Sequence, residues 1–342
     1  MVKVAIDAMG GDFGCAPIVE GCAFAMREAN FEPILVGKKE EILAHLPGHL
    51  HDRVTIVEAS DVIGMAESAT DAFKRKESSI YKAVDLVAKK EAQAVVSAGH
   101  SGATMGLATL RIGRLPGVAR PAIATLMPTT HEGKHTLVLD VGANVDSEPK
   151  HLFQFAIMGK AYANNLLKLE KPRVGLLANG EEDSKGDKLV KDTFALLSQL
   201  KLDGFNFIGN VEGGDVFKGH VDVVVCDGFV GNVLLKTGEG VADAIVDVLK
   251  RYVKKSPIAI LGALLMRSAF KGLKKDMDYA EYGGAPLIGV NGCAIVSHGK
   301  SNAKAMKNAI LQAIRFVESG VNPEIVRYLE RYQSATPKGE KA

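Results

Sequence analysis

Short glycine-rich segments combine small residues with the hydroxyl, amide, imidazole and ammonium groups that bind anions. They read DAMGGD at 7–12, SAGHSGA at 97–103, GEEDSKG at 180–186, DGFVGNVLLK at 227–236 and YGGAPLIG at 282–289, the last leading to HGKS at 298–301. Glycines let the backbone approach a ligand, and the N–H groups at a helix start favour negative charge. The chemistry shared by these segments is the handling of an anion such as phosphate.

Particular side chains in these segments fit particular roles. Asn232 can donate a hydrogen bond to a developing oxyanion, and Lys236 follows one helical turn later on the same face. Lys185 can hold an anion as a point charge. His100 can donate to an oxyanion or simply cap its turn, and Ser101 offers a hydroxyl without the full G-x-S-x-G nucleophile pattern. Each segment also has a purely structural interpretation, as a tight turn or a helix cap.

Familiar cofactor and metal motifs do not occur in the sequence. There is no G-x-G-x-x-G, no G-x-x-x-x-G-K-[ST] and no C-x-x-C among the four cysteines. The pairs His49/His51 and His131/His135 lack an accompanying carboxylate or cysteine pattern. The sequence therefore predicts neither a dinucleotide fingerprint nor a metal site.

The segments that must position these residues alternate between strand-like and helix-like patterns, which predicts an α/β fold, an αβα sandwich with a mainly parallel sheet. Because carboxyl ends of parallel strands meet at one edge, we expect the glycine-rich segments to converge there. Two β-prone runs within 121–141 predict a projecting β-hairpin. We expect residues 1–335 to form one large catalytic unit, with two closely packed lobes as the alternative, and 336–342 to form a flexible tail.

Composition narrows the function classes. The 342 residues are 47% apolar and 24% charged, and 42 Lys+Arg against 40 Asp+Glu give a net charge of +2. The absence of Trp and an aromatic content of 6% argue against binding of nucleic acid. No secretory signal pattern and no apolar run long enough to span a bilayer occur, so we expect a cytoplasmic protein.

One segment, 250–275, differs in charge from the rest of the chain. It holds eight basic residues and no acidic one, so that the remainder carries a net charge of −6. Within it lies an apolar run, PIAILGALLM at 257–266. Apolar residues rimmed by Lys and Arg predict a basic amphipathic helical segment that binds a membrane surface or a partner. The alternative is a core or dimer-interface helix with solvated lysines at its ends.

Together with DVGAN at 140–144, these segments resemble the bacterial phosphate acyltransferases of phospholipid synthesis, in order from residue 7 to about 300. The chain departs from the family pattern after SAG at 97–99, where it has His100 and Ser101 in place of Asn and Thr. The resemblance implies a fold similar to phosphate acetyltransferases and to isocitrate and isopropylmalate dehydrogenases. It also implies a homodimer.

The implied reaction transfers a long-chain acyl group from acyl carrier protein to inorganic phosphate, with no cofactor. The acyl phosphate product is passed to a membrane glycerol-3-phosphate acyltransferase. The catalytic residues that we expect are Lys185, Asn232 and His100. Those expected to bind phosphate or substrate are Asp7, Gly10, Gly11, Ser97, Gly99, Ser101, Gly102, Asp227, Gly231, Lys236 and His298.

In the light of this reaction the basic apolar segment has two candidate partners, the acidic carrier protein and an anionic membrane surface. We expect peripheral membrane association through Ile258–Phe270 and docking of the carrier protein on neighbouring basic residues. The residues expected at these contacts are Lys254, Lys255, Ile258, Leu261, Leu264, Leu265, Arg267, Phe270 and Lys271. Two alternatives remain from the sequence: a metal- and NAD-dependent decarboxylating hydroxyacid dehydrogenase of similar fold, and a non-catalytic membrane-associated scaffold.

Overall fold

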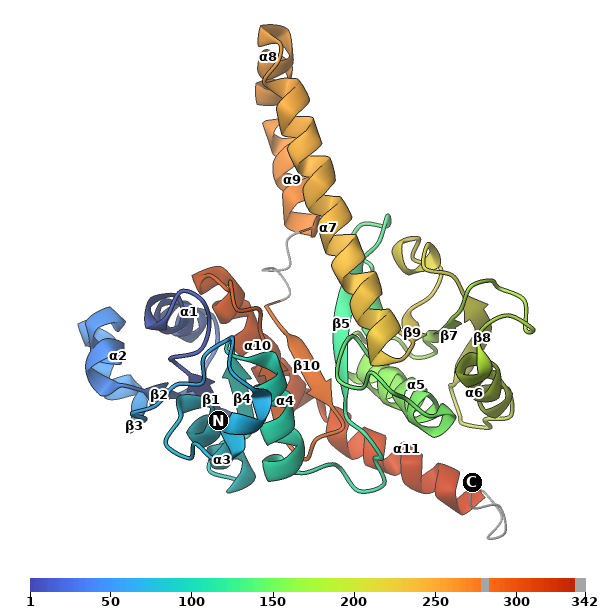
Figure 1. Ribbon diagram of the computed structural model, residues 1–342, viewed down its shortest axis with the longest axis horizontal. Helices are drawn as coiled ribbons and strands as arrows, with labels where there is room; N and C mark the ends of the chain where they lie inside the picture. Colours follow the sequence, from blue (N-terminus) through green and yellow to red (C-terminus); the bar gives the residue numbers. More distant parts are fainter. Residues whose placement is uncertain (278–282, 336–342) are drawn as a thin grey trace.

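The computed structural model describes residues 1–277 and 283–335 (Figure 1). The strands are β1 (Lys3–Asp7), β2 (Glu32–Gly37), β3 (Thr55–Glu58), β4 (Ala94–Ser97), β5 (Ala122–Pro128), β6 (His135–Leu139), β7 (Arg173–Leu177), β8 (Asn206–Val211), β9 (Val223–Val225), β10 (Ala285–Ile288) and β11 (Cys293–Val296). The α-helices are α1 (Cys15–Glu28), α2 (Lys39–His45), α3 (Ser79–Ala88), α4 (Ser101–Leu107), α5 (Pro149–Asn165), α6 (Lys188–Ser198), α7 (Gly228–Val253), α8 (Pro257–Leu265), α9 (Arg267–Met277), α10 (Ala303–Ser319) and α11 (Val321–Ala335). The predicted tail at 336–342 lies outside the described residues.

Among the described residues the strands form one sheet, in the order β3-β2-β1-β4-β11-β10-β5-β6-β9-β7-β8. Side chains alternate between its faces: Val4 and Ile6 join the core layer that contains α1, α5, α10 and α11, whereas Ala5 joins the layer that contains α3 and α4. Leu234 and Leu235 of α7 pack on this second layer. Helices therefore cover both faces, and the predicted αβα sandwich is confirmed.

The sheet contains two parallel groups that run in opposite directions. Strands β3, β2, β1, β4 and β11 are parallel to one another, as are β6, β9, β7 and β8. Between the groups, the pairs β11/β10, β10/β5 and β5/β6 are all antiparallel. Three reversals leave the second group antiparallel to the first. The expectation that all the strand-end segments share one edge is therefore wrong.

The central strands are short. The carboxyl ends of the two parallel groups therefore lie at similar positions along the strand direction. Through β11 and β10, Ser97 at the end of β4 is level with Thr125 of β5. Across β5 and β6, Asp140 is level with Ile123. Thr125 and Ile123 are two residues apart on β5, so the ends of β4 and β6 differ by about 7 Å along the strand direction. Loops from opposite edges can therefore border one cleft across the face of the sheet.

The predicted hairpin at 121–141 forms; its base is part of the sheet, and its tip lies beyond the outer strand pairings. Its strands β5 and β6 pair with each other from Ala124/Leu139 to Pro128/His135. Each strand also pairs on its outer side, β5 with β10 and β6 with β9, so both are interior strands of the sheet. The outer pairings involve Ala122 and Ile123 of β5 and Leu137–Leu139 of β6, so they fix the base of the hairpin in the body. Sequence reasoning missed β10, whose Ala-Pro-Leu-Ile run follows two glycines and contains a proline.

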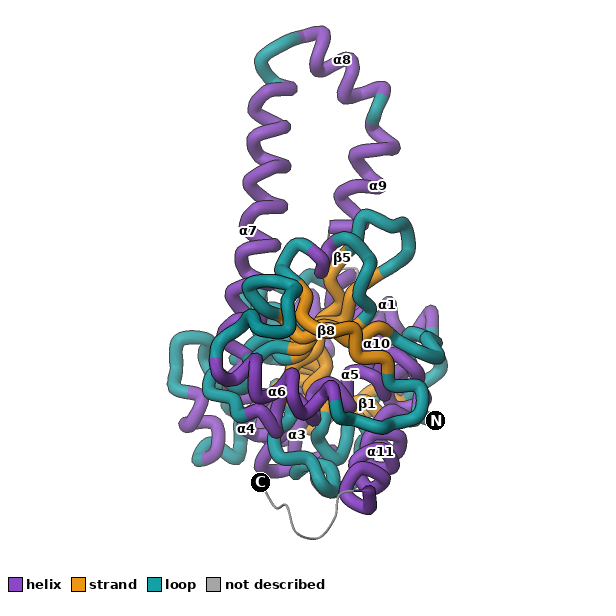
Figure 2. Tube along the Cα trace, turned by 90° about the vertical axis from the view of Figure 1, so that its right-hand side faces the viewer, coloured by secondary structure: helices purple, strands orange, loops and turns teal. Residues whose placement is uncertain are grey.

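A helical hairpin projects from the body. Helix α7 runs far beyond the sheet, and α8 and α9 turn the chain back toward it (Figures 1 and 2). At its tip, α8 has no buried residue, and Ile258 and Leu265 are 82% and 78% exposed. Helix α8 is therefore not a core helix within a single chain. The segment at 250–275 is helical, as expected, and comprises the end of α7, all of α8 and most of α9.

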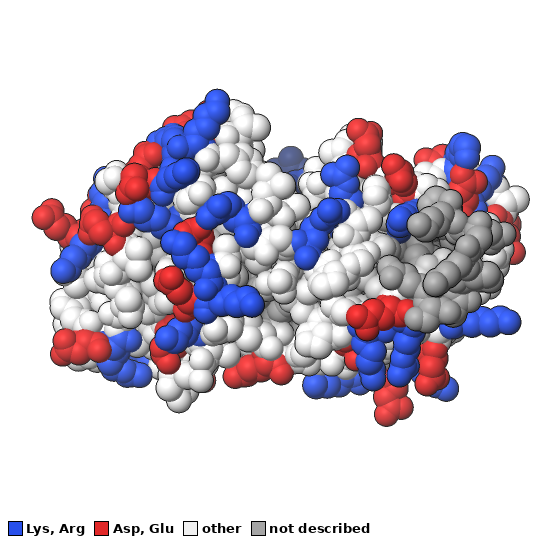
Figure 3. Space-filling view, turned by 90° about the horizontal axis from the view of Figure 1, so that it is seen from below, with Lys and Arg blue, Asp and Glu red and all other residues white. Residues whose placement is uncertain are grey.

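The charge of the body contrasts with that of the helical hairpin. The face opposite the hairpin carries Lys, Arg, Asp and Glu side chains intermixed over its surface (Figure 3). The segment 250–275, in contrast, has basic residues only. The positive charge is therefore concentrated around the apolar tip.

Glycine at position 231 allows α7 to start close to the sheet. A Cβ added to Gly231 would overlap the carbonyl oxygen of Asp140 and would also crowd Sγ of Cys226. Gly240, in the same helix, has no atom within 4 Å of an added Cβ. The two positions form a matched pair for testing this contact.

We expect Gly231→Ala to lower the free energy of unfolding by about 1–3 kcal/mol, because the helix must move away from the strand end. Gly240→Ala should instead raise it by about 0.5–1 kcal/mol through helix propensity. Thermal and urea unfolding of the two variants would test this. Equal unfolding curves would contradict the close approach.

Candidate active site

A buried carboxylate organises the loops at the end of the first parallel group. Ser97 donates its hydroxyl to Oδ2 of Asp7 at 2.7 Å and accepts the N–H of Gly99 at 3.0 Å. A Cβ at Gly10 would lie 2.7 Å from that same carboxylate oxygen and from the Gly99 nitrogen. Only glycine allows the β1 and β4 loops to approach this closely. Asp7 and Ser97 are thus engaged inside the protein, where they shape the site.

The environment of Asp7 affects its ionisation. Burial raises the pKa of its carboxyl, against the opposing effect of hydrogen bonds from Ser79 and Ser97. Because the folded-state pKa lies above the unfolded one, the favourable contribution of this group to stability is complete at low pH. It is lost as the pH rises toward the folded pKa.

A second buried carboxylate organises the loop after β6. Asp140 accepts the N–H groups of Ile123 at 3.0 Å and Ala143 at 3.0 Å, and the backbone and side-chain N–H groups of Asn144 at 2.7 and 2.8 Å. Gly142 also donates to it at 3.2 Å. Burial raises the pKa of the Asp140 carboxyl, and these donors oppose the effect. Asp140 therefore fixes residues 141–144 against β5.

The same loop positions the start of α7. The carbonyl of Asn144 accepts the N–H of Gly228 at 2.8 Å. Asp227 caps the helix, since its Oδ1 accepts the N–H groups of Phe229 and Val230, both at 2.9 Å. The Asp227 carboxylate is thus used as a helix cap, and Gly231 provides close packing. Asn232 and Lys236 follow on the first turns of the helix.

A cleft of about 650 Å³ lies between α4 and α7 across the sheet face. One part of it is polar and is bordered by loops from both edges of the sheet. The polar side chains that line the cleft are those of Ser101, Thr125, Asn232, Lys236, Thr237, Glu239, Ser297 and His298. The other part, which we call the apolar arm, is lined by Ile123, Met127, Phe217, Leu235, Ala242 and Ile245.

Four of the predicted site residues border this cleft, namely Ser101, Asn232, Lys236 and His298. Lys236 is paired with Glu239 at 2.8 Å, and Nδ1 of His298 accepts the N–H of Lys300 at 3.0 Å. These residues follow strands β4, β9 and β11. The carboxyl end of β9 lies at the opposite edge of the sheet from the carboxyl ends of β4 and β11. Their meeting depends on the stagger of the central strands.

The remaining glycines of the predicted site lie in loops beside the cleft. Gly11 has a φ of +100°, which a non-glycine residue rarely adopts, and the N–H of Asp12 next to it donates to the Gly299 carbonyl at 2.7 Å. A Cβ at Gly102 would lie 3.1 Å from the Ala69 side chain. The hydrogen bond ties the loop after β1 to the loop after β11, and the close approach at Gly102 packs the start of α4 on the 3-10 helix Ala69–Phe73.

His100 caps α4, since its Nδ1 accepts the N–H of Ala103 at 3.2 Å. In the neutral ring this hydrogen bond assigns the proton to Nε2, which can then donate to a ligand. Both roles expected from the sequence, cap and donor, are therefore compatible in one residue.

Lys185 is exposed on the loop after β7, and its side-chain stem lies over Gly180. It is not among the described residues that line the cleft. Its backbone N–H donates to the Glu182 carbonyl at 2.9 Å, and Gly186 donates to Oδ1 of Asn179 at 2.8 Å. The loop is thus folded on itself, with the Lys185 side chain exposed to solvent.

Sequence reasoning missed the apolar arm. Its lining comes from β5, from the short 3-10 helix Asp215–Phe217 and from one face of α7. Along α7 the lining residues Leu235, Gly238, Ala242 and Ile245 are three or four positions apart, which is the helical repeat. The spacing could have indicated an apolar face of α7 from the sequence. The residues of the facing wall, however, are far from α7 in sequence.

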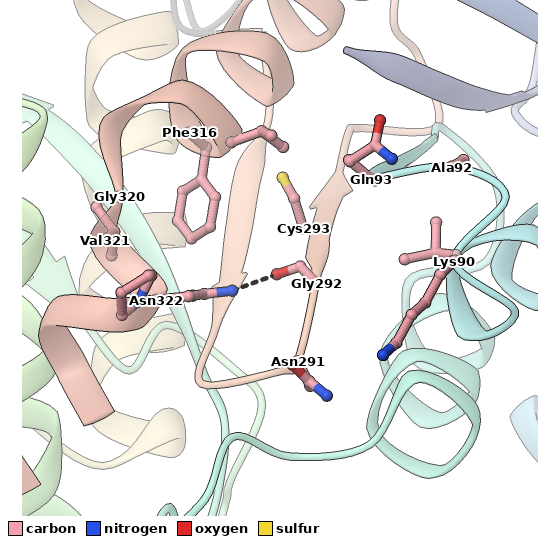
Figure 4. Close-up of a pocket in the computed structure, with 13 residues that line it drawn as sticks. Lys90, Ala92, Gln93, Asn291, Gly292, Cys293, Phe316, Gly320, Val321 and Asn322 are labelled. Atoms are coloured by element: carbon pink, nitrogen blue, oxygen red, sulfur yellow. Dashed lines mark hydrogen bonds between the residues drawn. The ribbon is translucent and has the colours of Figure 1, made fainter. Parts of the chain in front are cut away.

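A second cavity, of about 350 Å³, lies at the opposite ends of β4 and β11 (Figure 4). It is lined by Gln93 and Gly292, which precede these strands, and by Phe316 and Asn322. Nδ2 of Asn322 donates to the Gly292 carbonyl at 2.8 Å. None of the predicted site residues lines this cavity. Within residues 1–277 and 283–335, no three His, Cys, Asp or Glu side chains gather as ligands for a metal ion.

The contrast between Ser97 and Ser101 gives a stability test. Ser97→Ala removes one of the two hydroxyl donors of the buried Asp7 carboxylate, the other being Ser79, and should lower the free energy of unfolding by about 1–3 kcal/mol. Ser101→Ala removes an exposed hydroxyl and should change it by no more than about 0.5 kcal/mol. Urea unfolding measures both, and a Ser97→Ala variant as stable as Ser101→Ala would disprove the organising role of this hydrogen bond.

Comparison with known proteins identifies relatives over the whole chain. A family model described as "Fatty acid synthesis protein" matches residues 2–324. A phosphate acyltransferase of a Nitratiruptor species is 60% identical over 99% of this chain and 100% of its own length. One of Sulfurimonas denitrificans is 62% identical over 96% of this chain and 98% of its own length.

Solved structures show the same fold at lower identity. A phosphotransacetylase from Streptococcus pyogenes matches with a TM-score of 0.60 and 19% identity, covering 93% of this chain and 94% of that one. A branched-chain phosphotransacylase from Enterococcus faecalis matches with a TM-score of 0.57 and 17% identity, covering 93% and 100%. The fold expected from the sequence is thus confirmed. From its full-length relatives and its fold, the chain belongs to the phosphate acyltransferase family of fatty acid synthesis proteins.

Proposed function

We propose that the protein transfers a long-chain acyl group from acyl carrier protein to inorganic phosphate and so produces an acyl phosphate for phospholipid synthesis. The observation that carries the proposal is the cleft, in which amide, hydroxyl, imidazole and ammonium groups adjoin a long apolar wall. A phosphate dianion and an acyl chain need these two environments side by side. Relatives at about 60% identity that are named phosphate acyltransferases support the transfer over the dehydrogenase and scaffold alternatives.

The reaction needs no nucleophile from the protein. A phosphate oxygen attacks the thioester carbonyl carbon, a C–O bond forms, and the carbonyl oxygen becomes an oxyanion. When the tetrahedral intermediate collapses, the C–S bond breaks and the carrier protein leaves as a thiolate that takes up a proton. A thiol has a pKa near 8.5, so strong acid assistance is unnecessary. The protein must bring the reactants together and stabilise the oxyanion.

In this proposal Asn232 donates its amide N–H to the oxyanion, because it borders the cleft at the start of α7. Ser101 and His298 orient the phosphate from the opposite side. Lys236 and Lys185 neutralise its charge, Lys236 within the cleft and Lys185 from the loop after β7. His100, through Nε2, is the proton donor to the leaving group.

The helical hairpin is the proposed contact with lipid and carrier protein. We find no helix in residues 1–277 and 283–335 whose length and apolar character would let it cross a bilayer. The exposed apolar side chains of α8 can instead enter the interface of an anionic membrane, while Lys254, Lys255, Arg267 and Lys271 attract the headgroups or an acidic carrier protein. The acyl phosphate would then be released near the membrane glycerol-3-phosphate acyltransferase that consumes it.

The proposal includes a homodimer. Along the exposed part of α7, Val248 and Tyr252 are 44% and 60% exposed and lie on one side of the helix, four residues apart. A second copy of the chain would cover them. Light scattering in solution should then give twice the 36.4 kDa of one chain.

The catalytic assignment is tested with palmitoyl carrier protein and phosphate, trapping acyl phosphate with hydroxylamine. We expect Asn232→Ala to lower kcat by about 10²–10³, the usual loss for one oxyanion donor. Lys185→Ala should raise KM for phosphate, whereas Lys188→Ala, at a nearby exposed lysine paired with Asp192, should not. Turnover close to that of the parent in Asn232→Ala would remove the residue from the mechanism.

The membrane assignment is tested by flotation with vesicles that contain anionic phosphatidylglycerol. The double variant Leu261→Glu/Leu264→Glu should lose flotation, because two carboxylates at the tip oppose both apolar burial and attraction to the headgroups. Leu110→Glu, at a leucine that is 70% exposed outside the hairpin, serves as the control and should float like the parent. Flotation of the double variant with the parent would contradict the proposal.

A further inference from the structure

The apolar arm extends along α7 from the polar part of the cleft. Asn232 borders the polar part, and Ile245, thirteen residues later and 57% exposed, is the last residue of α7 that lines the cleft. At 1.5 Å per residue the distance along the helix axis is about 20 Å. An extended chain advances about 1.2 Å per backbone bond, so this distance corresponds to roughly sixteen bonds. The arm is thus as long as a long-chain acyl group.

The volume of the cleft agrees with this length. It is about 650 Å³ in total. A water molecule occupies about 30 Å³ in the liquid, and a methylene group is of similar size, so the cleft accommodates roughly twenty such groups. The apolar arm is also continuous with the polar part, so an acyl carbonyl held near Asn232 would direct its chain into it.

At position 238 the two walls of the arm lie close together. A Cβ added to Gly238 of α7 would lie 3.4 Å from the ring of Phe217 and 3.5 Å from the methyl group of Met127. Both of these side chains belong to the facing wall. One methyl group would therefore fill the remaining gap, and any larger side chain would have to enter the space of the cleft. Gly238 lies six residues, or about 9 Å, beyond Asn232.

We propose that the apolar arm binds the alkyl chain of the acyl substrate and that the lack of a side chain at Gly238, facing Phe217 and Met127, allows long chains to pass into the distal part of the arm. The inference rests on the proposed acyl transfer and adds to it the subsite that selects the chain. A large side chain at position 238 leaves about 9 Å, or seven to eight bonds, between the oxyanion site and the block. Each methylene buried in an apolar lining contributes roughly a fourfold gain in affinity, so loss of the distal arm penalises long chains selectively.

The test compares octanoyl and palmitoyl carrier protein as substrates at saturating phosphate. For Gly238→Leu we expect kcat/KM with the palmitoyl substrate, relative to the octanoyl substrate, to fall at least about tenfold below the parent ratio. Phe217→Ala widens the arm and should shift the ratio the other way. Gly240→Leu is the matched control, because no atom lies within 4 Å of a Cβ there, and its ratio should equal that of the parent.

Circular dichroism and thermal unfolding show whether Gly238→Leu is folded, and Gly238→Ala provides a milder variant. A folded Gly238→Leu with the parent ratio, or with equal losses for both substrates, would overturn the inference. If the parent forms no acyl phosphate from either substrate, the proposed function fails instead. In that case binding of the fluorescent fatty acid cis-parinaric acid still tests the subsite: Gly238→Leu should weaken it about tenfold and Gly240→Leu should not, and equal binding by both variants would disprove the subsite.

Discussion

The architecture of the site depends on the hydrogen bonding of a buried carboxylate, that of Asp140. A carboxylate withdrawn from water is costly unless donors surround it, and here the donors come from β5 and from the loop after β6. Satisfying the carboxylate therefore fixes the loop. The loop in turn accepts the first N–H of α7 through Asn144. Because α7 forms one wall of the cleft, the position of that wall follows from the hydrogen bonding of a single side chain.

A similar arrangement occurs at the other strand ends. Asp7, Ser97 and the N–H of Gly99 join the β1 loop to the β4 loop, which ends at the start of α4. The two carboxylates serve parallel groups that run in opposite directions. Since the central strands are short and staggered, the loops that they hold face each other across the sheet instead of lying at remote edges. The cleft is the result of this geometry.

The helical hairpin is characterised by exposed apolar side chains and not by buried carboxylates. Its apolar side chains at 258, 261, 264 and 265 are exposed, whereas leucines and isoleucines elsewhere in the chain are largely buried. A patch of this kind on a protein surface indicates an interaction. The same helix that carries the tip, α7, also lines the cleft at its other end. The proposed binding of lipid and of the acyl chain therefore involves one continuous element.

Local patterns in the sequence determined the sandwich, the family and the strand-end residues Ser101, Asn232, Lys236 and His298, because such features depend on the preferences of adjacent residues. Only the tertiary structure decided the opposite direction of the two parallel groups and the interior place of the hairpin at 121–141. The apolar arm is the clearest example, since Gly238 approaches Met127 and Phe217 only after the sheet has brought β5 beside α7. The sequence specifies a residue's chemistry, but which groups face one another is fixed by strand pairing and by the need to satisfy buried polar groups.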